Sequence, residues 1–262
     1  MKNKMKRYLS ASYAVRGSVA LVALLALSLL AAGCADSSKD NGGAASAYRP
    51  AEPGQVELDR LQGMYYGFSP DYDGSECGGM CWNIVTFLPD GQLFLDAPPS
   101  GGPETIDCAE AACQPYRIEN GELLLEDGET RTIEVVDDTL IIDDVELAPV
   151  LPVQEDLTLD QQYTHQGFSG LVGISAGSTS WQEDIVLRRD GTYESSNLML
   201  GSVEGGAPTT GAAGSDASGT YRISGNTISL TNSLGETEHA LFFIHVDDDS
   251  IQIGDRNFLV EP

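Results

Sequence analysis

Apolar residues in this chain come in short runs that are separated by turn-forming dipeptides. The runs are rich in β-branched and aromatic residues, and none shows the 3.6-residue apolar spacing of a long helix. This pattern predicts an all-β protein. In the first half we expect strands near 62–68, 82–88, 92–96, 115–119, 122–126, 130–136, 139–142 and 145–148. In the second half we expect them near 162–168, 182–189, 192–197, 219–224, 227–231, 236–246, 250–253 and 257–261.

The turns between these strands favour hairpins. Asp-Gly stands at 90–91 and 190–191, and Asn-Gly and Gly-Asn stand at 120–121 and 225–226. These residues tolerate the positive φ of a tight hairpin. Eight short strands in a row, each joined by a hairpin, predict an up-and-down meander closed into a β-barrel, with a β-sandwich as the alternative.

The two halves repeat one another. Leu61 and Tyr65 have the spacing of Leu159 and Tyr163, and Tyr-Arg-Ile recurs at 116–118 and 221–223. Cys81-Trp82 aligns with Ser180-Trp181, which predicts the same place for both tryptophans. We therefore expect two tandem eight-stranded barrels, the first over 58–149 and the second over 157–262, joined by a linker over 150–156.

The longest loops fall at one end of each predicted barrel. They are expected at 69–81 and 97–114 in the first half, and at 169–181 and 198–218 in the second. Binding residues concentrate on long loops held by a rigid scaffold. This end is therefore the expected working surface, with Tyr72, Trp82 and Trp181 as the candidate binding residues.

The N-terminus has the layout of a secretory signal. A basic stretch is followed by an apolar run over 19–32 and by Ala31-Ala32-Gly33-Cys34. This resembles the lipobox of bacterial lipoproteins, although Ala31 stands where the family has Leu. The resemblance implies removal of 1–33, lipidation (palmitate and related acyl chains) on Cys34, and a membrane anchor through that lipid. Ordinary cleavage after Ala32 or Gly33 is the alternative.

The residues after Cys34 complete this picture. The stretch 34–57 is rich in Ser, Ala, Gly and Pro, so we expect a flexible tether. In the lipoprotein family, Asp after the lipidated cysteine marks retention in the inner membrane. Ala35 occupies that position, which favours the outer membrane.

The sequence of the two predicted barrels also resembles a known group of domains. An aromatic start, a Trp on the second strand, an Asp-Gly hairpin and then Tyr-x-Ile before a Gly/Asn turn look like the small lipocalin-like domains of bacterial lipoproteins. They are distantly similar to the NlpE family of envelope lipoproteins. The resemblance implies a lipocalin-like barrel, and it supports the fold more than any function.

Four cysteines follow Cys34, and all lie in the two long loops of the first half. In an exported chain they predict two disulfides among Cys77, Cys81, Cys108 and Cys113. Three pairings are open, of which the local pairs organise the least chain. A thiolate metal site and a redox dithiol are alternatives, but the spacings differ from the usual Cys-x2-Cys.

The net charge of the chain excludes some classes of partner. The chain holds 40 acidic and 14 basic residues. Five of the basic residues precede Cys34, so the remainder has 40 acids against nine bases. Such a surface repels nucleic acid and anionic lipid. Apart from the membrane, the expected partner of a barrel of this kind is a small apolar ligand or another envelope protein.

Catalytic and cofactor motifs are missing from the sequence, so we expect no enzyme, no cofactor and no metal. The segment 71–76 spaces its carboxylates as calcium loops do, but it lacks the distal Glu of such loops. His239 and His245 share a face with Leu241 and Phe243, and they are too far apart to bind one ion.

Three functions stay open: a non-enzymatic binding module, a structural or stress-sensing lipoprotein with filled barrels, and a carboxylate-based hydrolase. An empty barrel interior favours the first, and a filled interior favours the second.

Overall fold

The computed structural model describes residues 48–54, 56–170, 177–203, 209–211, 217–246 and 249–260. Cys34, the expected signal peptide and most of the expected tether lie outside these residues. Contacts group Ala44–Pro262 into one compact unit, so both halves of the described chain belong to it. Within the described ranges, none of the helices has the length and apolar character that a bilayer crossing requires.

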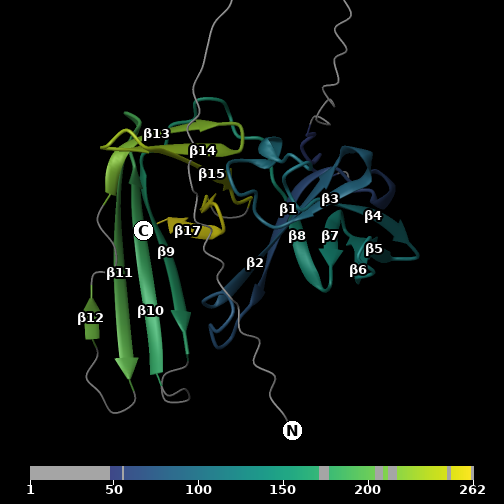
Figure 1. Ribbon diagram of the computed structural model, residues 1–262, viewed down its shortest axis with the longest axis horizontal. Helices are drawn as coiled ribbons and strands as arrows, with labels where there is room; N and C mark the ends of the chain where they lie inside the picture. The colour runs from purple at the N-terminus through teal and green to yellow at the C-terminus, as the bar shows by residue number, and fades with distance from the viewer. Residues whose placement is uncertain are drawn as a thin grey trace, which may run out of the picture. The chain divides into compact units, whose positions relative to one another are not determined.

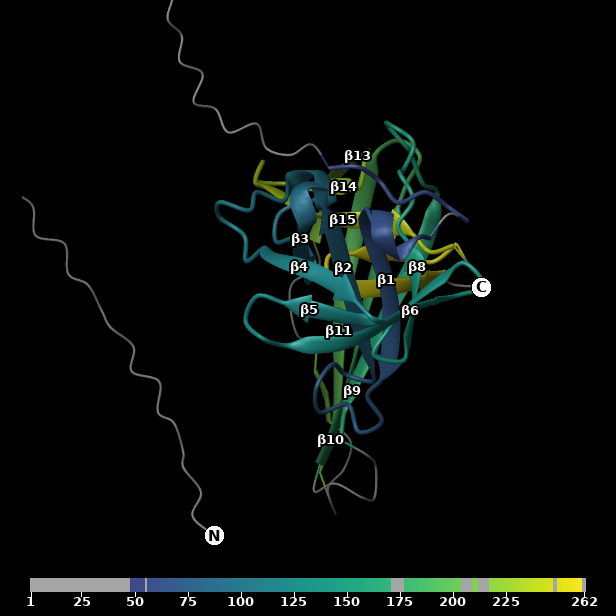
Figure 2. The same ribbon diagram turned by 90° about the vertical axis from the view of Figure 1, so that its right-hand side faces the viewer.

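The first eight strands form a closed antiparallel barrel in which neighbours in sequence are neighbours in the sheet. The barrel closes where β8 meets β1, through Tyr65 opposite Pro149 and Tyr66 opposite Ala148 (Figure 2). The strands are β1 (Gly63–Pro70), β2 (Met80–Leu88), β3 (Gln92–Leu95), β4 (Gln114–Glu119), β5 (Glu122–Leu125), β6 (Thr130–Val136), β7 (Thr139–Ile142) and β8 (Val145–Pro149).

The second half forms a further barrel, which closes where β10 pairs with β11. A short strand, β12, is added beside β11. The strands are β9 (Gln161–Ser169), β10 (Gly177–Leu187), β11 (Thr192–Val203), β12 (Thr209–Gly211), β13 (Ala217–Ser224), β14 (Thr227–Asn232), β15 (Thr237–Ile244), β16 (Ile251–Ile253) and β17 (Arg256–Val260). Three 3-10 turns, η1 (Leu58–Arg60), η2 (Pro89–Gly91) and η3 (Pro103–Thr105), complete the elements of the described chain.

The prediction of two tandem eight-stranded barrels is therefore confirmed, and the hairpin chemistry behind it is visible in the backbone. Asn120 has φ 55° and Gly121 has φ 80° at the β4–β5 turn. Gly225 has φ 56° at the corresponding β13–β14 turn. The sequence placed residues that accept positive φ where the strands reverse.

The prediction of long loops over 169–181 and 198–218 is wrong in part. β10 already begins at Gly177, and β11 continues to Val203, where the two strands pair residue by residue. The strands β9, β10 and β11 thus extend beyond the part of the sheet where β17 pairs with β9 and β13 pairs with β11 (Figure 1). Main-chain hydrogen bonds form this extension, and its Gly- and Ser-rich sequence gives little side-chain signal for it.

The interior of each barrel is filled by side chains. In the first barrel, Phe87 packs edge-to-face against Tyr65 and Tyr116, with ring centroids 5.9 and 5.3 Å apart. In the second barrel, Phe242 and Phe258 are buried with Tyr163 and Tyr221. This is the arrangement that was expected for barrels without a ligand in the lumen.

A third apolar cluster lies outside both interiors, where the two barrels meet. On β1, Met64 and Tyr66 alternate with Tyr65 and so face away from the first lumen. On β15, Leu241 and Phe243 alternate with Phe242 in the same way. These outward residues pack against one another, together with Ile84 and Val150. The outer faces of the two barrels therefore share a core of their own.

Candidate binding cleft

The loop between β1 and β2, Asp71–Gly79, is organised around one carboxylate and one disulfide. Asp71 Oδ2 accepts hydrogen bonds from the backbone N–H groups of Cys77 at 2.7 Å and Glu76 at 2.9 Å. The hydrogen bond from the Cys77 N–H has the largest effect on the Asp71 carboxylate. Together with the bond from Glu76, it lowers the pKa of Asp71 to about 2. The disulfide Cys77–Cys81, with Cα atoms 5.0 Å apart, closes the loop beside it.

The other disulfide is Cys108–Cys113, so both bonds are the local pairs. The prediction of two disulfides is confirmed. Asp71, Cys77 and Cys81 place potential ligand atoms within 4.8 Å of one another, but both sulfurs are in the disulfide and offer no thiolate. The calcium-like carboxylates serve their own loop too, because Asp73 accepts from the Ser75 N–H and hydroxyl.

The disulfide loop docks on the exposed end of β9 in the second barrel. The Phe168 N–H donates to Gly78 O at 2.9 Å, and the Gly170 N–H donates to Asp73 O at 2.8 Å. Gly74 and Gly79 lie so close to Phe168 that a Cβ at either position would clash with it. Glycine is required here because the loop backbone approaches the strand directly.

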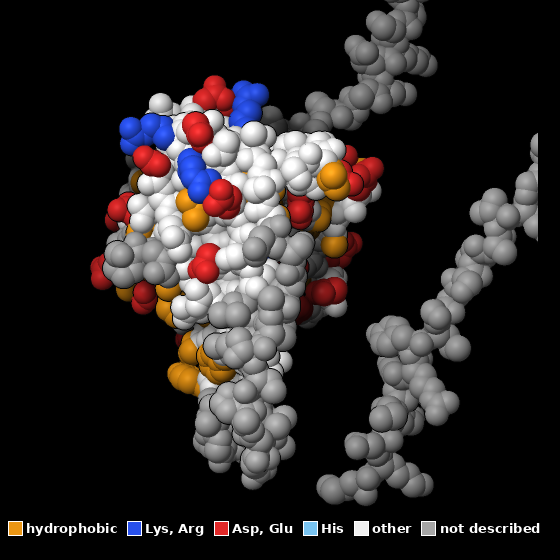
Figure 3. Space-filling model, turned by 90° about the vertical axis from the view of Figure 1, so that its left-hand side faces the viewer, with side chains coloured by type: hydrophobic (Ala, Val, Ile, Leu, Met, Phe, Trp, Pro, Cys, Tyr) orange, Lys and Arg blue, Asp and Glu red, His pale blue; other side chains and the backbone are white. Residues whose placement is uncertain are grey.

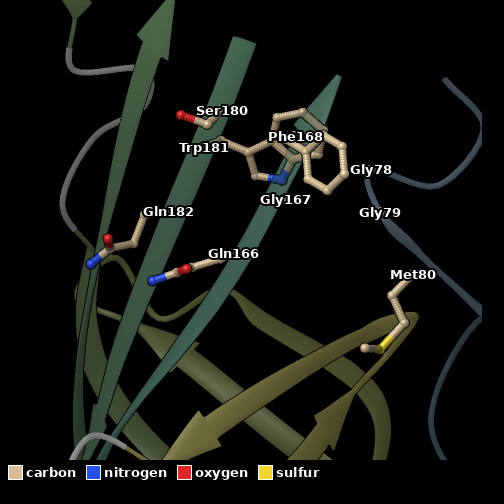
Figure 4. A pocket seen from close by; sticks show the side chains of 9 residues that line it. All are labelled: Gly78, Gly79, Met80, Gln166, Gly167, Phe168, Ser180, Trp181 and Gln182. Carbon is tan, nitrogen blue, oxygen red and sulfur yellow. The ribbon is translucent and has the colours of Figure 1, made fainter. Parts of the chain in front are cut away.

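A cavity of about 500 Å³ lies where this loop meets β9 and β10; we call it the Trp181 cavity. Figure 4 shows the Phe168 and Trp181 rings close to Gly78 and Gly79. The indole lies over Gly167, its cross-strand partner, and leaves no space for a Cβ there. Gln166, Gln182 and Ser180 supply neutral polar groups along the same two strands, and Met80 completes the lining.

A larger cavity of about 830 Å³ adjoins the shared outer core of the barrels; we call it the Trp82 cleft. Its apolar wall comes from both barrels and is unusually exposed. The exposed fractions are 54% for Phe68, 37% for Met80, 46% for Val246 and 49% for Leu259. Large apolar side chains gathered in this way are typical of a binding surface.

Trp82 is held at the base of this cleft by contacts with the second barrel. Its Nε1–H donates to Asn257 Oδ1 at 3.2 Å, and its ring packs edge-to-face on His245, with centroids 4.9 Å apart. Tyr66 beside it accepts a hydrogen bond from the Val246 N–H at 3.0 Å through its hydroxyl. These contacts hold the Trp82 and Tyr66 rings in place.

The charged rim of the Trp82 cleft is acidic. Asp138, Asp144 and Glu146 line it, and none of the described residues that line it is a Lys or an Arg. The charge of the chain as a whole has the same sign. On the face of the second barrel shown in Figure 3, acidic side chains are spread widely, whereas basic ones lie near one end.

The two tryptophans do not occupy equivalent places, which corrects the sequence alignment. Tyr65 is opposite Val85 in the first barrel, and Tyr163 is opposite Ile185 in the second. Counting back from these pairs, Trp82 is three residues from Val85 but Trp181 is four from Ile185. A shift of one residue turns a strand side chain to the other face. Trp82 therefore faces the junction, and Trp181 faces Gly167.

The third candidate, Tyr72, is 80% exposed on the disulfide loop and lines neither cavity. Met80 lines both cavities. The other long loop, which carries Cys108–Cys113, also contacts the second barrel. There the Gly102 N–H donates to Thr227 Oγ1 at 2.7 Å, and the Thr227 hydroxyl donates to Glu104 Oε1 at 2.8 Å.

The histidines have structural partners, as the sequence indicated. His239 is exposed and bonds to the Ser229 hydroxyl, at 2.8 Å. His245 stacks on Phe243, with ring centroids 5.4 Å apart.

Sequence reasoning missed Phe68, Met80, Val246 and Leu259. One signal could have found the junction, although not these residues individually. The runs Met64-Tyr65-Tyr66 and Leu241-Phe242-Phe243 are apolar at every position rather than at alternate ones. A strand with a continuous apolar run is buried on both faces, so it indicates a partner outside the barrel.

Comparison with known proteins returned no match: none was found among protein-family models, among curated proteins or among solved structures. The class of this protein is therefore defined by its fold, an all-β chain with two tandem eight-stranded barrels.

Proposed function

We propose that this chain is an exported lipoprotein, anchored to the outer membrane through lipid on Cys34, and that it acts as a non-enzymatic binding module. The ligand site in this proposal is the Trp82 cleft. The observation that carries it is the exposed apolar wall of that cleft, formed by Phe68, Met80, Val246 and Leu259.

The position of the site follows from the packing. In the described part of the chain, buried side chains pack the interior of both barrels, so the proposed site lies outside the lumens. The volume of the Trp82 cleft is within the range of about 300–1,000 Å³ that ligand sites occupy. Its aromatic floor is fixed by hydrogen bonds, which lowers the entropic cost of binding.

The anchor rests on the lipobox-like stretch that ends in Cys34, and Ala35 favours the outer membrane. Growth with an alkyne-tagged palmitate, followed by detergent phase partitioning, tests it. The wild-type chain should take up the label and partition with the detergent, and Cys34→Ser should do neither. A wild-type chain that stays unlabelled and aqueous would contradict the anchor.

Binding is tested with N-phenyl-1-naphthylamine, an uncharged dye that fluoresces in apolar sites. We expect saturable binding by the wild-type protein, and binding weakened about tenfold by Leu259→Ser, because about one large apolar contact is lost. Leu234→Ser is the matched control, since Leu234 is 83% exposed on the β14–β15 turn, away from the cleft. Equal effects of the two substitutions would place dye binding elsewhere.

The filled lumens also favour a second candidate, a structural or stress-sensing lipoprotein without a small-molecule ligand. The same titration separates the two functions. An absence of saturable dye binding in the folded wild-type protein would favour the second candidate.

A further inference from the structure

The carboxylates around the Trp82 cleft differ from their neighbours on the same hairpins. Arg131 forms an ion pair with Glu129 at 2.8 Å, and it lies 4.0 Å from Asp143. Among the described residues, no such cation reaches Asp138, Asp144 or Glu146, which line the cleft. The cleft thus combines uncompensated negative charge with an exposed apolar wall.

These two properties select a ligand of mixed character. Negative charge focused in a cleft attracts cations and repels anions. The wall offers aromatic faces at Phe68 and Trp82, where a cation or an apolar side chain can rest. A purely polar cation would leave Phe68, Val246 and Leu259 in water, and a neutral apolar molecule would leave the carboxylates unpaired.

The shape of the cleft favours more than one side chain. Its lining runs from β1 and β2 across the tips of the β6–β7 and β7–β8 hairpins to β17 of the second barrel. The acids lie on the hairpin side, and Val246 and Leu259 come from the other barrel. A ligand that meets both therefore carries several groups in a row.

We propose that the Trp82 cleft binds a basic peptide segment, in which Lys or Arg side chains flank an aromatic or aliphatic one. The apolar side chain rests on Phe68, Trp82 and Leu259, and the basic groups face Asp138, Asp144 and Glu146. This proposal rests on the proposed binding function and names its ligand class.

The test is calorimetric titration of the full-length mature protein in phosphatidylcholine nanodiscs, with empty nanodiscs as the blank. The probes are three capped peptides of one pattern, Lys-Leu-Phe-Lys-Leu-Lys and its versions with Gln or Glu in place of Lys. A fourth peptide keeps the lysines and has Ser in place of Leu and Phe. We expect the Lys-Leu-Phe peptide to bind at least about tenfold more tightly than each of the others. We expect its affinity to fall with added salt.

The decisive variant neutralises the rim, with Asp138→Asn, Asp144→Asn and Glu146→Gln together. Asp138 and Asp144 have φ values of 63° and 64°, a region that Asn accepts as well as Asp, so the turns should persist. We expect the preference for the basic peptide over the Gln peptide to disappear. The control neutralises three exposed acids that do not line the cleft, with Glu122→Gln, Glu126→Gln and Glu238→Gln.

Each outcome decides between the proposals. If the uncharged dye binds but the protein shows no preference among the peptides, the peptide proposal is overturned and the binding function stands. If neither dye nor peptide binds, both proposals fall. If the control variant removes the preference as fully as the rim variant, overall charge rather than the cleft selects the peptide, and the proposal is overturned.

Discussion

Asp71 shows how a single carboxylate orders the disulfide loop. It lies at the end of β1, where the backbone N–H groups of Glu76 and Cys77 converge on one of its oxygens. These hydrogen bonds favour the ionised form, which is why the pKa falls from its ordinary value of 3.8 to about 2.

The sign of the resulting pH dependence follows from that shift. Because the pKa is lower in the folded protein, ionisation of Asp71 stabilises the folded loop. The stabilisation is fully present above about pH 3.8 and is lost as the pH falls through about 2. Asp71→Asn should remove this dependence and speed amide exchange at Cys77 by about an order of magnitude.

Asp127→Asn provides the comparison, because Asp127 accepts one backbone N–H, that of Glu129, in a different hairpin. It should leave exchange in the disulfide loop unchanged. Exchange at Cys77 that is the same in wild type and Asp71→Asn would show that the carboxylate does not order the loop.

The tryptophans mark the limit of sequence reasoning at this scale. Two Trp residues with similar neighbours looked equivalent, and both do line cavities. Their faces differ because the repeat drifts by one residue within a single strand, and no pattern around Trp181 fixes that drift. Sequence identified the residue type, and only the strand register gave its direction.

At the scale of elements, the disulfide loop covers a sheet edge. Within the described residues, β17 pairs with β9 at Tyr163 and Thr164 alone, which leaves the far end of β9 without that neighbour. An uncovered strand edge invites pairing with another chain. The hydrogen bonds from Phe168 and Gly170 to the loop occupy this edge, so a loop of the first barrel protects the second.

Because of this contact, we expect a change in the first barrel to affect the second barrel. Replacing Cys77 and Cys81 with Ser should lower the free energy of unfolding by about 2 kcal/mol, because the unfolded chain gains freedom. Amide exchange at Phe168 and Gly170 should also accelerate, although the second barrel has no cysteine. Hydrogen exchange followed by mass spectrometry of the β9 peptide measures this.

The Cys108→Ser and Cys113→Ser pair is the control, since that disulfide is in the other long loop. It should leave Phe168 and Gly170 protected. The idea fails if β9 exchanges at the same rate with and without the Cys77–Cys81 bond.

Strand positions were largely predictable because each strand combines apolar alternation with turn residues at its ends. β6 and β7 have the predicted bounds, and both turns that follow them hold Asp residues at positive φ. The extension of β10 and β11 was not predictable in this way. It depends on main-chain pairing between segments such as Gly177–Ser180, whose side chains carry no alternation.

For the whole molecule, the shared outer core joins the two barrels into one compact unit. Phe243 is fully buried there, and its ring lies 4.6 Å from that of Tyr66. Tyr66 in turn accepts the Val246 N–H, so packing and hydrogen bonding cooperate at the junction.

Phe243→Ala should therefore lower the free energy of unfolding by about 3–5 kcal/mol, as expected for the truncation of a large buried aromatic side chain. The substitution should weaken the contact between the barrels as well as the second barrel itself. The two barrels should then unfold separately, so we expect two transitions in calorimetry. Phe242→Ala is the matched change on the lumen side of the same strand, and it should destabilise the second barrel while the junction contacts persist. Indistinguishable unfolding profiles for the two variants would contradict a separate role for the junction.

The Trp82 cleft itself could not be read from local patterns. Phe68 and Leu259 line the same cavity although almost the whole described chain separates them. Their proximity depends on how one barrel packs on the other, which hairpins and alternation do not encode. Continuous apolar runs in β1 and β15 indicate only that a junction exists.

The residues of the barrel strands fall into two sets, those that fill the lumens and those that line the outward-facing cleft. The side chains that form the core of each barrel point inward, as Phe87 and Phe258 do, whereas side chains that line the cleft point outward, as Phe68 and Leu259 do. Strand alternation places members of both sets side by side in one sequence. Substitutions that line the cleft are surface substitutions, most of which shift stability by less than about 0.5 kcal/mol, so the cleft can change while the barrels stay folded. Binding preference in proteins with this architecture is expected to diverge faster than the fold that supports it.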